Sequence, residues 1–378
     1  MTVASRVTAA LLVPALALVA ACDGDDGPGG EPRPTLTQAP AGAATSVPGV
    51  TGGPTVSGTV TLGRFQIDEF EMPARDGYPH SIAVDGQGRL WFTELQGNKL
   101  SMFDPTTEEF HEWDVPTANA QPHGIGVDRD GAVWLTYITV SKIARFDPGT
   151  EQFREFAIPS PNSGPHSIAF DQQGDVWFTQ SRGNRIARLD RETGAVEEVA
   201  VPTPASRPYG IAVDQRGVVW WAELLGHKIG RYDPATRALD ELSPPTPEQG
   251  ARRIAVDASG GVWFTEHDAG KLGYYDPQAG RFEEYDLPTP NGQPYAITVA
   301  RDGKIWLSQV AANKIVRFTP PASSGPFKGG FNEFEIPTPD AECRTIVEDA
   351  EGVIWCPESG AGKLLRIEFI PLEPKEGD

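Results

Sequence analysis

Basic residues, cysteines and long apolar runs are all scarce in this chain of 378 residues. Its 32 Lys and Arg stand against 52 Asp and Glu, which gives a formal charge of −20. Phosphate binding needs a basic surface, so we expect no nucleic-acid partner; the acidic excess favours solubility over a site for cations. The three cysteines form no Cys-x-x-Cys motif, which excludes a metal or redox centre of that kind. Apolar residues do not follow the 3.6-residue period of helical repeats.

The first 22 residues have the pattern of an export signal. Arg6 precedes the apolar run from Val7 to Ala21, which is too short to cross a membrane as a helix. The run ends in Val-Ala-Ala-Cys, which resembles a bacterial lipobox and predicts lipidation of Cys22. We therefore expect an exported, membrane-anchored lipoprotein that contacts the membrane only through its N-terminal lipid. An ordinary signal peptide with an incidental cysteine is the alternative.

The composition divides the rest of the chain into three parts. Residues 23–63 are Gly, Pro, Thr, Ser and Ala with almost no large apolar side chain, which predicts a flexible tether. Residues 64–370 form one expected domain, followed by a short C-terminal tail at 371–378. The 41 Gly and 35 Pro of the whole chain indicate many turns, which favours an all-β fold.

Tryptophan marks an internal repeat within residues 64–370. The first five gaps between successive members are 43 residues and the sixth is 49, which an insertion from Thr319 to Gly330 explains. The members are Trp91, Trp134, Trp177, Trp220, Trp263, Trp306 and Trp355. A period of this length with four short apolar strands per copy predicts a seven-bladed β-propeller.

Each repeat has the same four-strand pattern. In the first copy an inner strand contains Ile82 to Val84, an Asp-x-x-Gly turn follows, and a second strand carries Trp91. The third and fourth strands resemble Lys142–Phe146 and Phe153–Phe156 of the second copy. The turn recurs in every copy except one, where Ala300 replaces the aspartate. We expect the tryptophan to pack between neighbouring blades.

The two ends of the domain predict how the ring closes. The last repeat stops at its third strand, near Leu364 to Ile367, whereas Phe65 to Met72 has the pattern of a fourth strand. The N-terminal strand should therefore complete the last blade and remove its free edge, and we expect a monomer. Cys343 and Cys356 lie thirteen residues apart in that blade, not directly opposite each other in the expected hairpin. The sequence therefore leaves open whether they form a disulfide.

The repeat also predicts a ring of polar residues. If Val84 faces Leu90, then His80 faces Glu94 at one end of the first hairpin, within one residue of register. The inner strand of a propeller blade lines the central channel, so the equivalent pairs should surround one mouth of that channel. The pairs are His80/Glu94, His123/Tyr137, His166/Gln180, Tyr209/Glu223, Arg252/Glu266, Tyr295/Gln309 and Arg344/Glu358.

This ring is the candidate site for a small-molecule or peptide ligand. Histidine can act as a base near neutral pH, and glutamate can hold Mg²⁺. The candidate catalytic residues are His80, His123 and His166; the candidate substrate-binding residues are Tyr137, Tyr209, Arg252, Tyr295 and Arg344; the candidate metal ligands are Glu94, Glu342 and Glu358. The alternative is a polar plug in which Arg252–Glu266 and Arg344–Glu358 are cross-strand ion pairs.

The repeat resembles the blades of the virginiamycin B lyase family. Pro-His-x-Ile, Val-Trp-Phe-Thr-Glu, Asn-Lys-Ile-x-Arg and Glu-Phe-x-Ile-Pro-Thr-Pro carry the resemblance, which spans Phe65 to about Phe369. It implies a seven-bladed propeller that opens a cyclic depsipeptide by carbon–oxygen elimination across its ester, using Mg²⁺, glutamate ligands and a histidine base. It also implies that Glu342 and Glu358 are the Mg²⁺ ligands.

Two positions depart from the family pattern. Arg344 stands where the resemblance implies the base histidine, and Tyr295 stands where it implies a substrate-binding histidine. Arginine stays protonated and cannot abstract a proton. A Mg²⁺-dependent lyase is therefore one hypothesis and a non-enzymatic binding propeller is the other. A lactonase-type propeller fits least, because it needs an Asp/Asn/Glu cage for Ca²⁺ and this ring is rich in His, Tyr and Arg.

Overall fold

The computed structural model describes residues 56–62, 65–321 and 329–370. The predicted signal peptide with Cys22, most of the predicted tether and the tail at 371–378 lie outside these residues. The described part contains one short 3-10 turn, η1 (Arg75–Gly77), and no helix long and apolar enough to cross a membrane.

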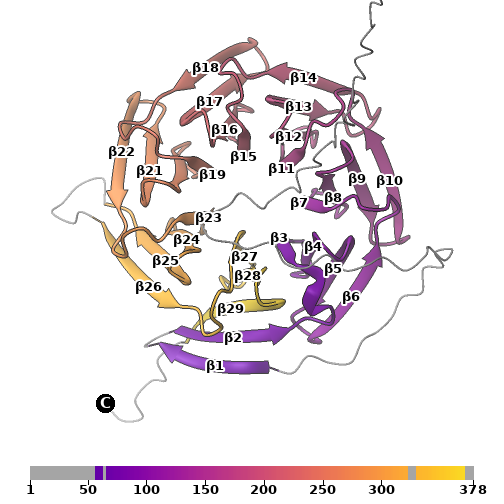
Figure 1. Cartoon of the computed structure of the whole chain (residues 1–378), viewed down its shortest axis with the longest axis vertical. Helices are drawn as coiled ribbons and strands as arrows, with labels where there is room; N and C mark the ends of the chain where they lie inside the picture. Colours follow the sequence, from indigo (N-terminus) through magenta and orange to yellow (C-terminus); the bar gives the residue numbers. More distant parts are fainter. Residues whose placement is uncertain (1–55, 63–64, 322–328, 371–378) are drawn as a thin grey trace, which may run out of the picture. The chain divides into compact units, whose positions relative to one another are not determined.

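Seven antiparallel sheets surround a central channel, as predicted (Figure 1). Each inner strand pairs with a second strand that carries the repeated tryptophan. The inner strands of blades one to seven are β3 (Pro79–Val84), β7 (Pro122–Val127), β11 (Pro165–Phe170), β15 (Pro208–Val213), β19 (Ala251–Val256), β23 (Pro294–Val299) and β27 (Val347–Glu348). The second strands are β4 (Leu90–Glu94), β8 (Val133–Tyr137), β12 (Val176–Gln180), β16 (Val219–Glu223), β20 (Val262–Glu266), β24 (Ile305–Gln309) and β28 (Ile354–Glu358).

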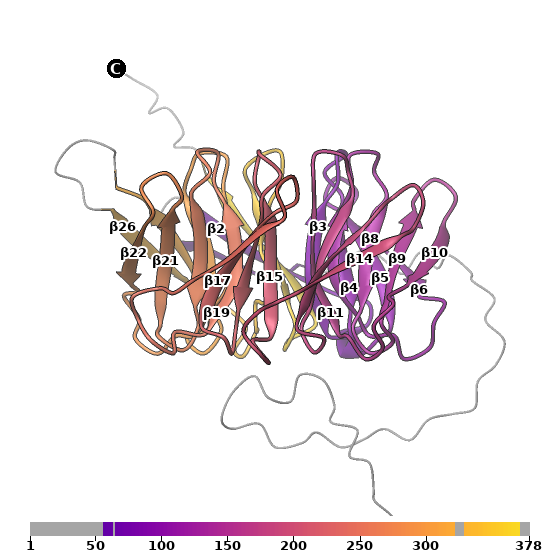
Figure 2. The same cartoon turned by 90° about the horizontal axis from the view of Figure 1, so that it is seen from above.

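Two further strands complete each blade, and all of them run between the two faces of the ring (Figure 2). The third strands are β5 (Lys99–Asp104), β9 (Lys142–Asp147), β13 (Arg185–Leu189), β17 (Lys228–Asp233), β21 (Lys271–Asp276), β25 (Lys314–Thr319) and β29 (Lys363–Phe369). The outer strands of blades one to six are β6 (Glu109–Asp114), β10 (Gln152–Ala157), β14 (Val196–Ala200), β18 (Ala238–Leu242), β22 (Arg281–Asp286) and β26 (Gly330–Glu335).

Blade seven closes the ring with strands from both ends of the domain. β2 (Phe65–Glu71) pairs with β29 along its whole length, which confirms the predicted closure. Glu69 on β2 accepts hydrogen bonds from Lys363 Nζ at 2.9 Å and from Thr338 Oγ1 at 2.7 Å, so the closing strand is also held by the loop after blade six.

A fifth strand adds to blade seven at a place where no strand was predicted. β1 (Val56–Leu62) pairs with β2, so the predicted tether is wrong for this stretch and the sheet begins earlier (Figure 1). The stretch Val-Ser-Gly-Thr-Val-Thr-Leu is rich in β-branched residues, which favour strands even without large side chains.

The repeated tryptophans form the core between blades, as predicted, and each is at most 5% exposed. Trp91, for example, packs with Val133, Leu135 and Phe146 of the next blade. Its indole Nε1 donates to Asp85 Oδ2 at 2.8 Å. Six of the seven blades repeat this bond, because the aspartate of the Asp-x-x-Gly turn has a second role as the indole's partner. In blade six Ala300 leaves the Trp306 indole without this carboxylate.

A threonine on the second strand links neighbouring blades. Thr93 Oγ1 accepts the amide of Ser81 at 3.1 Å and donates to the carbonyl of His123 in the next blade at 2.9 Å. The hairpin register shifts beside this contact, between Pro79 and Ile82. The same shift recurs in blades two to six, including blade four, where Ala222 replaces the threonine, so the shift does not require the hydroxyl.

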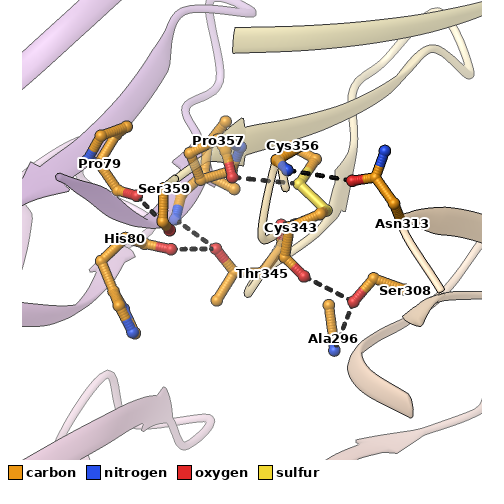
Figure 3. The surroundings of a disulfide bond; sticks show 12 residues. Pro79, His80, Ala296, Ser308, Asn313, Cys343, Thr345, Cys356, Pro357 and Ser359 are labelled. Carbon is orange, nitrogen blue, oxygen red and sulfur yellow. Dashed lines mark hydrogen bonds between the residues drawn. A yellow bond between two sulfur atoms is a disulfide. The ribbon is translucent and has the colours of Figure 1, made fainter. Parts of the chain in front are cut away.

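The inner strand of blade seven is the shortest and is covalently tied. β27 contributes only Val347 and Glu348 to the ladder. A disulfide joins Cys343 to Cys356 on β28, with their Cα atoms 5.9 Å apart, which settles the pairing left open by the sequence (Figure 3). Neighbouring blades hold the same segment through Ser308 Oγ, which donates to the Cys343 carbonyl, and through Thr345 Oγ1, which donates to the His80 carbonyl.

Candidate functional site

The predicted polar ring gathers at one end of the channel. Its members are the second residues of the inner strands, with Arg344 at the matching position of blade seven. They are His80, His123, His166, Tyr209, Arg252, Tyr295 and Arg344, all between 0% and 8% exposed. The structure thus brings together all three predicted catalytic histidines and four of the five predicted substrate-binding residues; their roles stay predictions.

Four aromatic rings of adjacent blades stack in one half of this ring. The centroid distances are 4.0 Å from His80 to His123, 3.9 Å from His123 to His166, and 3.8 Å from His166 to Tyr209. The hydroxyl of Tyr209 is hydrogen-bonded to that of Tyr295, two blades further on. These contacts bring aromatic side chains of five blades together at this end of the channel.

Burial lowers the pKa of two histidines in this stack. Burial lowers the pKa of His80 well below its ordinary value, and the positive charge of Arg344 and the neighbouring His123 add to the effect. His166 has its pKa lowered for the same reason. Their Nδ1 atoms lie 3.1 and 3.0 Å from the hydroxyls of the following serines, whereas their Nε2 atoms are buried and have no partner among the described residues.

The other half of the ring is cationic and reaches the mouth of the channel. The Arg252 guanidinium lies 4.6 Å from the Tyr295 ring centroid, and that of Arg344 lies 5.3 Å from it. Arg344 Nη2 is 3.2 Å from Glu342 Oε2, so this arginine forms an ion pair with Glu342, two residues away, which the sequence pattern did not predict. The Glu342 side chain is 39% exposed.

Tyr78 belongs to the mouth but was not predicted. Its hydroxyl donates to Glu342 Oε2 at 2.8 Å, and its ring lies 5.7 Å from the Arg344 guanidinium. Burial raises the pKa of Tyr78, so the hydroxyl keeps its proton. Tyr78 and Glu342 occupy the same repeat position in blades one and seven, where the backbone φ is positive in both (55° and 54°). This shared repeat position was the signal in the sequence that could have placed Tyr78 beside Glu342.

The pairing of His80 with Glu94 was predicted to within one residue, and the structure puts Pro79, the preceding residue, opposite Glu94, so His80 does not face Glu94 directly. Glu94 instead bonds within its own blade, where Oε1 accepts from Ser101 Oγ at 2.5 Å. The same shift separates every predicted pair in blades two to six. The ends of the second strands therefore form a separate set, all 0% exposed: Glu94, Tyr137, Gln180, Glu223, Glu266, Gln309 and Glu358.

Burial makes the glutamates of this second set weak acids. It raises the pKa of Glu266 to about 8 and that of Glu358 to about 9, against the lowering effect of the nearby Lys271 and Lys363. The pKa values of Glu94 and Glu223 are raised for the same reason. Blades three and six carry glutamine at this position, so the fold accommodates an uncharged group there.

The predicted magnesium ligands do not form one set of donors. Glu342 is engaged by Tyr78 and Arg344, Glu94 by Ser101, and Glu358 is fully buried with a raised pKa. A cation needs deprotonated ligands that point at one place. In the part of the chain that the structure describes, no three His, Cys, Asp or Glu side chains gather in this way. The residues present do not fit a magnesium site.

Comparison with known proteins identifies relatives along the whole propeller. The model of the Virginiamycin B lyase family matches residues 50–227 and 212–370. A solved streptogramin B lyase is 30% identical, with a TM-score of 0.75 over 81% of this chain and 98% of its own. Virginiamycin B lyase from Staphylococcus aureus is 29% identical, with the same TM-score over 81% of this chain and all of its own.

More distant structures share only the fold. The WD40 propeller domain of Doa1 is 12% identical with a TM-score of 0.62. No curated protein matches the chain. The match along all seven blades, together with the blade-by-blade geometry, shows that the chain belongs to the virginiamycin B lyase family.

Proposed function

We propose that the channel mouth around Tyr78, Glu342 and Arg344 binds a small-molecule or peptide ligand without the elimination chemistry of the lyases in this family. The observation that carries this proposal is Arg344 itself. It stands where the family resemblance implies the base, and a guanidinium has no lone pair with which to take a proton. It can instead donate hydrogen bonds to a carbonyl or carboxylate of a ligand.

The chemistry of the mouth suits recognition. The cluster offers a carboxylate that is within hydrogen-bond distance of both a cation and a phenol, and the Tyr295 ring gives Arg344 an aromatic face. A ligand with both donors and acceptors, such as a peptide or depsipeptide, can exchange its own bonds for the Arg344–Glu342 pair. The exposed Glu342 side chain gives such a ligand access.

A carbon–oxygen lyase is the second candidate, because the ring contains His80. An uncharged imidazole can accept a proton, and the lowered pKa of His80 makes it a weak base until a substrate changes its surroundings. Its side chain is only 1% exposed, so a substrate must first displace part of the histidine stack. The predicted magnesium ligands do not gather as a group of three among the described residues, so this candidate rests on the imidazole of His80.

One experiment separates the two candidates. The full chain is incubated with streptogramin B and a panel of linear and cyclic depsipeptides, with and without Mg²⁺, and both Tm and products are measured. The binding proposal expects a rise in Tm without ring-opened product. That rise should disappear in Arg344→Gln and persist in Arg237→Gln, whose side chain is 79% exposed and serves as the control. A ring-opened product that His80→Ala abolishes would establish the lyase instead.

The cellular setting is a further part of the proposal. The lipobox pattern ending at Cys22 supports a monomeric propeller exported and held at a membrane by its lipid. Replacing Cys22 by serine should release the protein from the membrane fraction, and size-exclusion chromatography should report one chain per particle. Retention of the Cys22→Ser variant in membranes would contradict the lipid anchor.

A further inference from the structure

A small cavity lies in the channel directly beyond the polar ring. It measures about 130 Å³ and is lined by the third and fourth residues of the inner strands, by their counterparts in blade seven, and by Arg344 of the polar ring. One water molecule occupies about 30 Å³ in the liquid, so the cavity has room for a group of a few heavy atoms. No Asp or Glu is among its lining residues.

The sevenfold repeat singles out one residue of this lining. At the position after the polar ring, six blades carry small side chains and blade five carries an arginine. The six are Ser81, Gly124, Ser167, Gly210, Ala296 and Thr345, and the arginine is Arg253. A long cationic side chain therefore enters a space that the other blades leave open. The propeller architecture does not require an arginine at this position, since the other six blades have none there.

The contacts of Arg253 leave one edge of its guanidinium unused. Nη1 donates to Ser167 Oγ at 2.8 Å. The rings of Tyr209 and Tyr295 lie 5.5 and 5.6 Å from its central carbon. Nε and Nη2 are buried and have no hydrogen-bond partner among the residues that the structure describes.

These two nitrogens are the pair that recognises planar oxyanions. Their N–H bonds point in the same direction along one edge of the guanidinium and can donate two parallel hydrogen bonds. Arg253 as a whole is only partly buried. Its Nε and Nη2 atoms, however, are shielded from solvent without an acceptor, which is unfavourable for donors of a charged group, so an anion that accepts from both would stabilise them. We propose that the cavity binds a small carboxylate or another planar oxyanion of that size, held by Nε and Nη2 of Arg253.

The test uses the full chain in buffers of equal ionic strength. Formate and acetate should raise Tm by about 2 °C or more over chloride at saturating concentration, because a ligand of the folded state stabilises it. Gluconate, a carboxylate too large for the cavity, should behave like chloride. The preference for formate should disappear in Arg253→Gln and also in Arg253→Lys, which keeps the charge but not the fork. Arg237→Gln should retain the preference.

A direct measurement covers the case in which the variants do not fold. Saturation-transfer NMR on the wild-type protein should detect the methyl protons of acetate, and formate should compete for that signal. Equal stabilisation by chloride and formate would overturn the oxyanion assignment. Absence of the acetate signal, or an undiminished signal in a folded Arg253→Gln variant, would overturn the site.

Discussion

Removing the Cys343–Cys356 disulfide should lower the free energy of unfolding of the propeller by about 3 kcal/mol. The two cysteines are separated by 13 residues. Cross-linking a loop of this size removes about 10 cal/mol/K of chain entropy from the unfolded state, which corresponds to about 3 kcal/mol at 25 °C. The double variant Cys343→Ala/Cys356→Ala tests this with little change in side-chain volume.

The contacts around the disulfide predict which segment becomes less stable first when the bond is removed. β27 has only two residues in the ladder, so the segment from Cys343 to Ile346 depends on the disulfide and on side-chain bonds from Ser308 and Thr345 (Figure 3). Arg344 belongs to this segment. We therefore expect its amide to exchange with solvent faster in the double variant than in the wild type, while the amides of β11 stay protected.

Urea unfolding followed by tryptophan fluorescence measures the global effect. The wild type in dithiothreitol should move to the midpoint of the double variant, and the double variant should not respond to dithiothreitol. A wild-type midpoint that is the same with and without reductant would refute the reasoning, as would faster exchange spread evenly over all seven blades.

Three further changes test other parts of the structure. In Glu266→Gln we expect a gain in Tm relative to wild type that grows from pH 6 to pH 9. The pKa of Glu266 is raised from 4.5 to about 8 on folding, so its contribution to stability is present below pH 4.5 and lost as pH rises through 8. Ala300→Asp should add about 1 kcal/mol by giving the Trp306 indole a partner, whereas Ala300→Leu should not. Thr338→Val should cost about 1–2 kcal/mol in urea unfolding, because it removes a hydroxyl donor from the charged Glu69; an unchanged midpoint would contradict its role in closure.

The sequence predicts the architecture well because the same pattern occurs in seven copies. The tryptophan spacing, the turn glycines and the incomplete last copy are independent signals, and each indicates a closed ring of seven blades. Near its turn, the hairpin of the first blade keeps the ordinary antiparallel register, so Val84 faces Leu90 and Ile82 faces Phe92 as expected.

The site is less predictable because the hairpin register shifts there. The shift puts Pro79 opposite Glu94, so Glu94 does not face His80 directly. Strand propensity and alternation contain no information about such a shift. The predicted pairs likewise did not include the ion pair between Arg344 and Glu342. Arg253, in contrast, was visible in the sequence as the one large residue among small ones.

The closing of blade seven by strands from both ends of the domain has a consequence for biosynthesis. β2 leaves the ribosome near the beginning of translation, and its partner β29 leaves near the end. Until then six blades can form one after another, but the circle stays open and the edge of β2 that faces β29 has no neighbour. A nascent chain interrupted anywhere before Lys363 cannot complete the ring, so truncated products should be recognised by proteases as unfinished.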